Sequence, residues 1–297
     1  MIKSTILKAL MMLAAYHFVF PHIPRTYFEL SGPQRDNYSR AQRYVYDIPS
    51  QTKAIVGSSL SLRFNESTLG PGYYKLCLGG ASIFNGLEII RRTRRHPPVV
   101  LIEINQLTWD TDQELLHDLF TPWLMRLRGH FPMFREEGRP ANFVNGIGNV
   151  FLQKSFHRVS RLLGRRPPTE DLSAGGSALN PALFSRIFRL YHDELYAVAP
   201  SNLTQQASRL GECVDALSRD GSICILYEMP IDSALSDLPA PAAVRNAAEA
   251  RFPKDKYHWL QFPHDHNYDT YDGLHVSAAE ADRLTEILVR QVNQISH

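Results

Sequence analysis

Two pairs of residues in this chain could carry nucleophilic chemistry. Ser58 and Ser59 lie in the segment AIVGSSLSL, residues 54–62, and Asp272 and His275 stand three apart in YDGLHVSAAEADRL. An Asp that orients an imidazole, which then takes a proton from a serine hydroxyl, activates that hydroxyl at neutral pH. Helix capping explains the serines as well, and local capping explains the Asp. The pattern therefore predicts either a serine nucleophile with its base or a set of helix caps.

Short apolar runs that alternate with helical patterns predict an α/β fold. The runs that predict buried strands cover residues 53–57, 73–79, 98–105 and 222–229, with a fifth candidate at 257–262. The helical patterns cover residues 85–95, 203–221 and 277–295. This alternation predicts a three-layer α/β/α sandwich around a mostly parallel, flavodoxin-like sheet. Active sites of such sheets lie at the carboxyl ends of the strands, which is where Ser59 falls.

Four segments resemble, in order, the sequence blocks of the SGNH, or GDSL-type, hydrolases. AIVGSSLS is similar to the first block, in which a strand ends in Gly-Asp-Ser-Leu and the serine is the nucleophile. LCLGGAS resembles the second block, VVLIEINQL the third, normally Gly-x-Asn-Asp, and DGLHVSAAEADRL the fifth. The resemblance covers residues 53–105 and 205–295, and it implies an SGNH-like fold.

The resemblance implies a role for each residue of a triad. Ser59 is the expected nucleophile, His275 the general base and Asp272 its orienting partner. The chain order Ser, Asp, His is one of several that converge on this geometry. Ser58 is the next candidate nucleophile.

The same resemblance implies an oxyanion hole. Its donors are the backbone N–H groups of Ser59 and Gly80 and the side-chain amide of Asn105. Gly79 could replace Gly80, because the match of the second block is uncertain by one residue. A donor of this kind contributes about 3 kcal/mol to lowering the barrier. The alternative for Asn105 is a turn residue after a strand.

Two departures from the family pattern bear on the pocket. Ser58 stands where the first block has Asp, and Glu103 and Gln106 replace the Gly and Asp of the third block. Glu103 is either a buried, paired carboxylate or a residue that reshapes the pocket, so the candidate pocket residues are Ser58, Gly79, Glu103 and Gln106. These departures resemble membrane-anchored branches that act in polysaccharide O-acetylation and in D-alanyl transfer to teichoic acid.

The first 20 residues combine a basic start with an apolar run. Lys3 and Lys8 precede residues 9–20, which are apolar except for His17. This pattern is typical of a signal anchor whose lysines stay in the cytoplasm. A span needs about 20 apolar residues, a length that is reached if Lys8 snorkels. We expect residues 1–24 to form an uncleaved single-pass anchor; the alternative is a buried amphipathic helix of a soluble protein.

The remaining residues, 25–297, are predicted to form one catalytic domain with an insertion. The insertion, at about 107–202, is helical and aromatic, and we expect it to build one wall of the cleft. Within it, residues 151–168 carry five Lys or Arg residues and no acid. Such a segment suits either an anionic membrane surface or a partner, or it is a solvated helix face.

Composition excludes several other classes of function. The 32 basic and 30 acidic residues give a net charge of +2, so no global field attracts nucleic acid. Cys77, Cys213 and Cys224 show no metal-binding spacing; a Cys213–Cys224 disulfide is conceivable, but buried thiols are favoured. The ligand types His264, Asp265, His266 and Asp269 match no zinc pattern, so no metal or cofactor is expected.

These observations lead to one principal expectation about function. The chain is expected to be an extracytoplasmic serine O-acyltransferase of the cytoplasmic membrane that forms an acyl-enzyme on Ser59 and passes an acyl group, acetyl by preference, to an envelope polysaccharide. Its expected partner is a multipass membrane acyltransferase. One alternative is an esterase that acts on acylated glycans. The other is a catalytically idle protein that binds glycan or scaffolds a membrane complex.

Overall fold

The computed structural model describes residues 2–23, 33–139, 142, 179–194, 200–263 and 267–296. The chain divides into two compact units. One unit comprises residues 1–46 and 117–170, and the other comprises 47–116 and 171–297. The second unit contains the sheet and every residue of the predicted triad.

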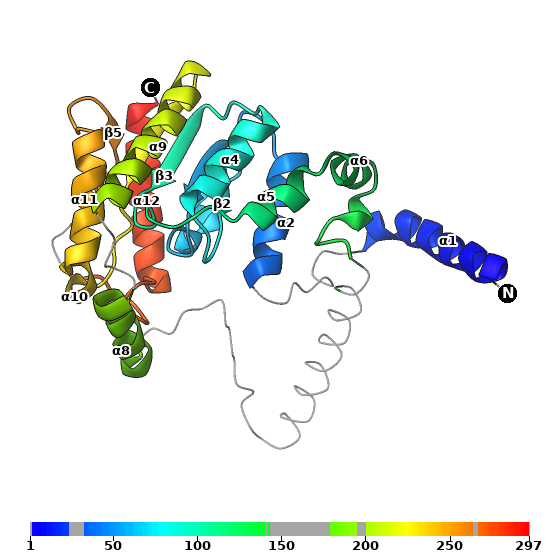
Figure 1. The fold of residues 1–297 in the computed structure, drawn as a ribbon, viewed down its shortest axis with the longest axis horizontal. Helices are drawn as coiled ribbons and strands as arrows, with labels where there is room; N and C mark the ends of the chain where they lie inside the picture. The colour runs from blue at the N-terminus through cyan, green and yellow to red at the C-terminus, as the bar shows by residue number, and fades with distance from the viewer. Residues whose placement is uncertain are drawn as a thin grey trace. The chain divides into compact units, whose positions relative to one another are not determined.

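The second unit is built on a five-stranded parallel sheet (Figure 1). Its strands are β1 (Lys53–Gly57), β2 (Tyr73–Cys77), β3 (Val99–Glu103), β4 (Ile223–Tyr227) and β5 (His258–Trp259). Their order across the sheet is β2-β1-β3-β4-β5. The order reverses at β1, so the crevice for a ligand is expected beyond the carboxyl ends of β1 and β3.

The helices of this unit lie between and after the strands. They are α3 (Glu66–Leu69), α4 (Ile83–Thr93), α8 (Pro181–Arg189), α9 (Pro200–Arg219), α10 (Ser233–Ser236), α11 (Pro239–Arg251) and α12 (Ala278–Ile295). A 3₁₀ turn, η3 (Ser61–Arg63), follows β1, and a π-helical turn, η5 (Leu190–Glu194), follows α8. Helix α5 (Gln113–Phe120) joins the two units in sequence.

One face of the sheet packs against α12. Ile55 and Leu101 from the strands belong to one buried cluster with Leu284, Leu288 and Val292 of the helix. These helix residues recur at spacings of four, which places them on one side of α12. Fully burying a side chain of this size contributes about 1.5–3 kcal/mol.

The other face packs against α4 and α9. Gly86 lets α4 approach the sheet closely, since an added Cβ would lie 2.8 Å from Val56 Cγ1. On α9 the Val214 carbonyl lies 3.9 Å from Cys224 Sγ of β4. Helices therefore cover both faces, and the predicted α/β architecture with a parallel sheet is confirmed.

The strands end earlier than the apolar runs suggest. The predicted third strand, 98–105, ends at Glu103, and the chain turns immediately afterwards through a Leu107 N–H bond to Ile104 O of 3.0 Å. The fifth strand has two residues rather than the six of 257–262. The ladder stops there because the Gln261 N–H donates to the side chain of Gln291 instead of a strand.

The ends of the helices follow identifiable caps. Helix α4 begins after Ser82, whose side chain accepts from the Phe84 N–H, and it ends at Arg94 in the left-handed conformation with φ 51°. Ser277 caps α12 by accepting from the Glu280 N–H at 3.3 Å, as its position in the sequence predicts.

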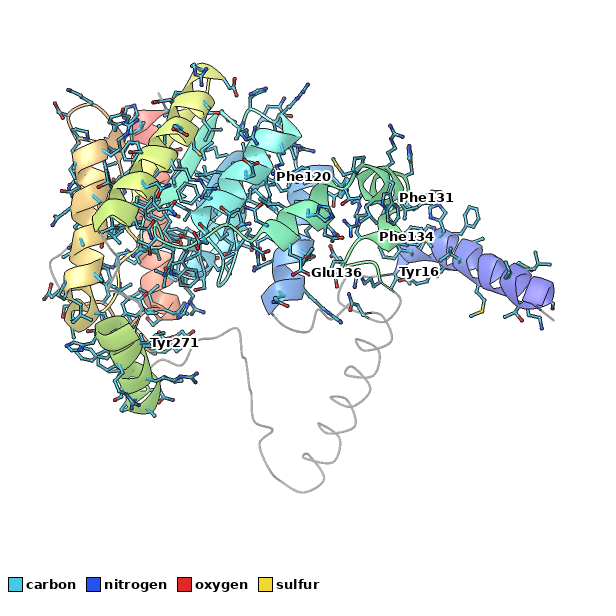
Figure 2. All side chains as sticks on the ribbon, in the orientation of Figure 1. Tyr16, Phe120, Phe131, Phe134, Glu136 and Tyr271 are labelled. Atoms are coloured by element: carbon cyan, nitrogen blue, oxygen red, sulfur yellow. The ribbon has the colours of Figure 1, made fainter. Side chains whose placement is uncertain are left out.

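The first unit contains α1 (Ile2–Val19), η1 (Phe20–His22), α2 (Pro33–Tyr46), α6 (Pro122–His130) and η4 (Pro132–Phe134). The end of α1 is tied to the segment after α6, since the Tyr16 hydroxyl donates to Gly138 O at 2.9 Å and the rings of His17 and Phe131 lie 5.3 Å apart. Tyr16 and Phe131 are labelled in Figure 2. On α2, the Arg43 guanidinium donates to Glu137 at 2.7 and 2.8 Å. These contacts join the start of the chain to residues 94 or more positions later.

No helix among the described residues is both long and apolar enough to cross a membrane. The anchor predicted for residues 1–24 is therefore unsupported by the structure. Helix α1 does expose apolar side chains, among them Met12 and Phe18 at 74% and 75%. The basic segment 151–168 lies outside the described residues.

Candidate active site

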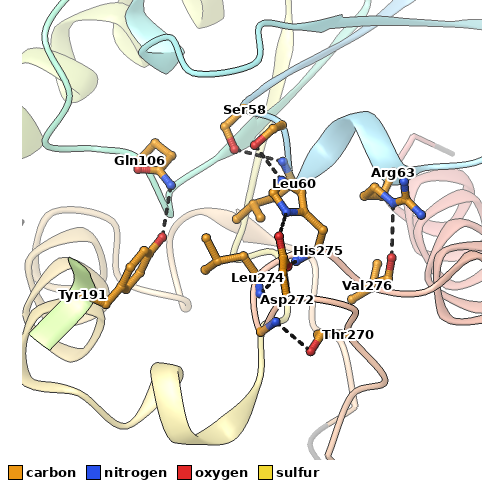
Figure 3. Close-up of polar contacts among 12 residues, drawn as sticks. Ser58, Leu60, Arg63, Gln106, Tyr191, Thr270, Asp272, Leu274, His275 and Val276 are labelled. Carbon is orange, nitrogen blue, oxygen red and sulfur yellow. Dashed lines mark hydrogen bonds and ion pairs between the residues drawn. The ribbon is translucent and has the colours of Figure 1, made fainter. Parts of the chain in front are cut away.

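Ser59 lies in the turn that leaves the carboxyl end of β1. The neighbouring Ser58 hydroxyl accepts from the Leu60 N–H at 3.2 Å, so Ser58 is the serine that satisfies a local backbone donor (Figure 3). Ser59 is half-buried, and its Oγ points instead to a histidine from the far end of the chain. Of the two serines, Ser58 therefore satisfies a local backbone donor, although no side chain caps the 3₁₀ turn η3 that follows, and the Ser59 hydroxyl faces His275.

Ser59, His275 and Asp272 form a continuous chain of hydrogen bonds. His275 Nε2 lies 2.9 Å from Ser59 Oγ, and His275 Nδ1 lies 2.8 Å from Asp272 Oδ2. The other carboxylate oxygen, Oδ1, accepts from the backbone N–H groups of His275 at 2.8 Å and Leu274 at 3.0 Å. Asp272 thus shapes the loop and orients the imidazole at once. This geometry is the one that a general base needs to activate a serine.

The environment of Asp272 favours its ionised form. Burial alone would raise the pKa of this carboxyl, but the hydrogen bonds from the His275 ring and backbone and from the Leu274 N–H outweigh burial and lower the pKa. An ionised Asp272 stabilises the imidazolium that forms when His275 accepts a proton. The His275 side chain is 18% exposed, so the base remains accessible to a substrate.

The loop that carries Asp272 and His275 is fixed by its own backbone. Gly273, at φ +93°, donates its N–H to Thr270 Oγ1 at 3.1 Å, and Thr270 forms an antiparallel bridge with Val276. The Tyr271 N–H donates to His275 O at 3.1 Å. These contacts hold the imidazole in front of Ser59 immediately before α12 begins.

Aromatic stacking adds a contact to His275 that the sequence motifs do not indicate. The Tyr271 ring lies over the imidazole with centroids 5.5 Å apart and planes 17° apart. On the Tyr271 ring lies the Arg63 guanidinium, 5.7 Å from the centroid, and Arg63 Nε also donates to Val276 O at 3.2 Å. Sequence reasoning missed both residues, and the only signal was the position of Tyr271 next to the D-x-x-H pair.

Part of the predicted insertion lies against this loop. The Asn180 N–H donates to Tyr271 O at 2.7 Å, and the Phe184 ring of α8 lies where a Cβ on Gly273 would clash, at 2.7 Å. Asn180 and Phe184 therefore lie against the loop that carries Asp272 and His275, and the expectation that the insertion builds a wall of the cleft stays a prediction.

The two backbone donors that the resemblance implies for an oxyanion hole lie in the turns that follow β1 and β2. The N–H groups of Ser59 and Gly80 have no hydrogen-bond partner among the described residues. Gly80 is exposed with φ +69°, and an added Cβ on Gly79 would lie 3.8 Å from Ser59 Cβ. The glycine turn after β2 thus adjoins the serine turn after β1, as the resemblance implies.

Asn105 links the ends of β3 and β4. Its Nδ2 donates to Met229 O at 2.9 Å, and its Oδ1 accepts from the Met229 N–H at 2.7 Å. An amide nitrogen carries two hydrogens, so one N–H of Asn105 remains for a ligand. Asn105 therefore lies in the turn after β3, as its position suggests, and its side chain ties that turn to Met229.

Three of the four candidate pocket residues are buried. Ser58 is 1% exposed, Glu103 0% and Gln106 4%. Gln106 Nε2 lies 3.5 Å from the Tyr191 hydroxyl, and Glu103 accepts hydrogen bonds from Ser58 and Ser61. These three side chains are therefore buried in the interior of the protein. Gly79 remains at the surface beside Ser59.

The cysteines are free thiols. No Cys213–Cys224 disulfide forms, and burial raises the pKa of the Cys224 thiol to about 11.

His264, Asp265 and His266 lie outside the described residues. Within the part of the chain that the structure describes, no three His, Cys, Asp or Glu side chains are placed to hold a metal.

Comparisons with known proteins identify no relative. No family model, no curated protein and no solved structure matches this chain. The functional argument therefore rests on the motif segments and on the geometry around Ser59.

Proposed function

We propose that this protein is an SGNH-type serine O-acyltransferase that works through an acyl-enzyme on Ser59. The observation that carries the proposal is the unbroken chain from Ser59 Oγ through His275 to Asp272, at 2.9 and 2.8 Å. Supporting it are the sheet order β2-β1-β3-β4-β5, which is the flavodoxin-like doubly wound order, and the two unpartnered N–H groups of Ser59 and Gly80 in the described chain.

The first half-reaction forms the acyl-enzyme. His275 Nε2 accepts the proton of Ser59 Oγ while Oγ attacks the carbonyl carbon of an ester. The oxygen of the tetrahedral intermediate accepts from the N–H groups of Ser59 and Gly80, with the second N–H of Asn105 as a third donor. The C–O bond of the ester then breaks, and the alcohol leaves with the proton from His275.

The second half-reaction decides between transfer and hydrolysis. A hydroxyl group of the acceptor gives its proton to His275 Nε2 and attacks the acyl carbon. The bond between that carbon and Ser59 Oγ then breaks, and His275 returns the proton to Oγ, which restores the free serine. If water takes this place, the enzyme is an esterase on acylated glycans. The His275 side chain is 18% exposed, so we expect either acceptor to reach it. The complete triad geometry favours both of these activities over an idle binding or scaffold protein.

The proposed acyl group is acetyl, and the proposed acceptor is a hydroxyl of an envelope polysaccharide outside the cytoplasm. These choices rest on the resemblance to membrane-anchored envelope acylation proteins and on the basic, apolar start of the chain. A multipass membrane acyltransferase is the proposed source of the acyl group.

The test is turnover of p-nitrophenyl acetate with and without neutral and acidic oligosaccharides. Wild type is expected to release p-nitrophenol and to yield acetylated oligosaccharide, and Ser59→Ala and His275→Ala are expected to lose about 10³-fold or more in kcat. Ser67→Ala, at an exposed serine, is the control. Acetate as the sole acetyl product would favour the esterase, and no release above buffer would favour the idle protein.

A further inference from the structure

A buried carboxylate lies directly beneath the turn that carries Ser59. Glu103, the last residue of β3, is 0% exposed. Its Oε2 accepts from the Ser58 N–H at 2.9 Å, and its Oε1 accepts from the Ser58 hydroxyl at 2.7 Å. The Ser61 hydroxyl also donates to Oε2. Glu103 therefore binds Ser58, on one side of Ser59, and Ser61, on the other.

The network continues to a third strand. The Tyr227 hydroxyl, at the end of β4, lies 2.6 Å from Ser61 Oγ, and it is the donor because Ser61 donates to the carboxylate. The space around Glu103 is fully used, since a Cβ added to Gly57 would lie 2.6 Å from both Glu103 Oε2 and Ser61 Oγ. The ends of β1, β3 and β4 are thus joined by one set of directed hydrogen bonds.

We propose that Glu103 is a positioning residue for the nucleophile, acting through Ser58 and Ser61. The carboxylate fixes the backbone on both sides of Ser59 and thereby sets Ser59 Oγ 2.9 Å from His275 Nε2. It also sets the direction of the Ser59 N–H. This inference rests on the proposed role of Ser59 as nucleophile.

The energetics of the group support a role beyond stability. A buried carboxylate is costly unless it is fully hydrogen-bonded, and an apolar residue of similar size is often as stabilising. Burial raises the pKa of Glu103 despite the hydrogen bonds from Ser61 and Ser58, so its ionised form is costly here. The carboxylate instead fixes the position of the Ser59 hydroxyl. A misplacement of about 1 Å at a reacting group can lower the rate about 10²-fold.

The experiment measures how fast a fluorophosphonate inactivates the intact protein. The variants are Glu103→Gln, Ser61→Ala and Tyr227→Phe, which remove one part of the network each. Ser222→Ala is the matched control, because Ser222 is also buried and donates one hydrogen bond, to Pro97 O at 2.7 Å, at the opposite ends of the strands. Each preparation is assayed well below its melting temperature, so that only folded protein is compared.

A positioning role predicts a loss of maximal inactivation rate with an unchanged half-saturating concentration. We expect a fall of about 10-fold to 100-fold for Glu103→Gln and smaller falls for Ser61→Ala and Tyr227→Phe. Ser222→Ala keeps the wild-type rate. If Glu103→Gln does not fold, the two milder variants decide the matter.

Wild-type rates in all folded network variants would overturn the positioning role and leave the proposed function intact. A wild-type protein that never forms an adduct at Ser59 would overturn the proposed function and this inference together. The two failures are therefore distinguishable by the wild-type reaction alone.

Discussion

Asp272 combines the two roles that its sequence context suggests. One carboxylate oxygen caps the loop through the N–H groups of Leu274 and His275, and the other binds the imidazole. Ser58 and Ser59 divide the corresponding roles between two residues, because Ser58 bonds to the backbone and to Glu103 while Ser59 faces His275. At the scale of the residue, local hydrogen bonds to the backbone are therefore compatible with the proposed catalytic geometry.

Tyr271 is expected to affect catalysis through the orientation of His275. Tyr271→Phe keeps the stacked ring and should retain activity, whereas Tyr271→Ala should lower kcat/KM for p-nitrophenyl acetate about 2-fold to 10-fold, since aromatic pairs contribute about 0.5–1.5 kcal/mol. A kcat/KM for the Ala variant equal to that of the Phe variant would show that the stacking has no catalytic role.

Glu103 is expected to make stability depend on pH. Its pKa is raised in the folded state above 4.5, so the folded protein holds this proton more tightly than the unfolded chain. The stability that this group contributes is present below the unfolded pKa and is lost as the pH rises through the folded pKa. Relative to Glu103→Gln, the wild-type free energy of unfolding should therefore fall as the pH rises above the unfolded pKa of about 4.3.

Urea unfolding at several pH values measures this difference. A gap between wild type and Glu103→Gln that does not change with pH, or that moves in favour of wild type as the pH rises, would contradict the raised pKa.

At the scale of secondary-structure elements, apolar pattern and caps predicted most of the fold. The four longer strands were predicted because they are buried on both faces and therefore read as continuous apolar runs. The fifth was predicted too long, because the bond from the Gln261 N–H to the Gln291 side chain is a tertiary contact that no local pattern encodes. For Glu103, a buried and paired carboxylate was one of the two predicted alternatives, and the structure agrees with it. Its partners Ser61 and Tyr227 were not predicted, since the three residues follow or end three different strands.

Helix α4 offers a test of how closely the helices pack on the sheet. Gly86→Ala should destabilise the protein by about 1–3 kcal/mol, because the added Cβ would lie 2.8 Å from Val56 Cγ1 and 3.2 Å from Leu76 O. Gly129→Ala on α6 is the matched control, since nothing lies within 4 Å of its added Cβ and alanine favours a helix by about 0.5–1 kcal/mol. Denaturant unfolding that found Gly86→Ala as stable as Gly129→Ala would refute this close packing.

At the scale of the whole molecule, the chain brings together residues that are far apart in sequence. Ser59 and His275 are separated by 216 positions, and the parallel sheet places both at its carboxyl edge. The motif segments predicted this meeting because each follows a strand or precedes the last helix. The positions of apolar residues alone could not show which side chains would touch.

The cellular location of the protein can be predicted from the charges around its first apolar segment. Lys3 and Lys8 precede the apolar run and Arg25 follows it, a bias that should keep the amino terminus in the cytoplasm. A reporter that is active only outside the cytoplasm, fused after His297, is therefore expected to be active. Replacing both lysines with glutamate should weaken that signal. If only a cytoplasmic reporter is active, the proposal of envelope acylation is contradicted, and an intracellular esterase becomes the better interpretation.

The acyl-enzyme itself is the most direct test of the central claim. Wild type and Ser59→Ala are each mixed with p-nitrophenyl acetate, quenched in acid within the first turnovers, and analysed by intact mass and peptide fragmentation. The account predicts one added acetyl group on wild type, located on Ser59, and none on Ser59→Ala. Acetylation at Ser58 or at any other residue, with Ser59 unmodified, would contradict it.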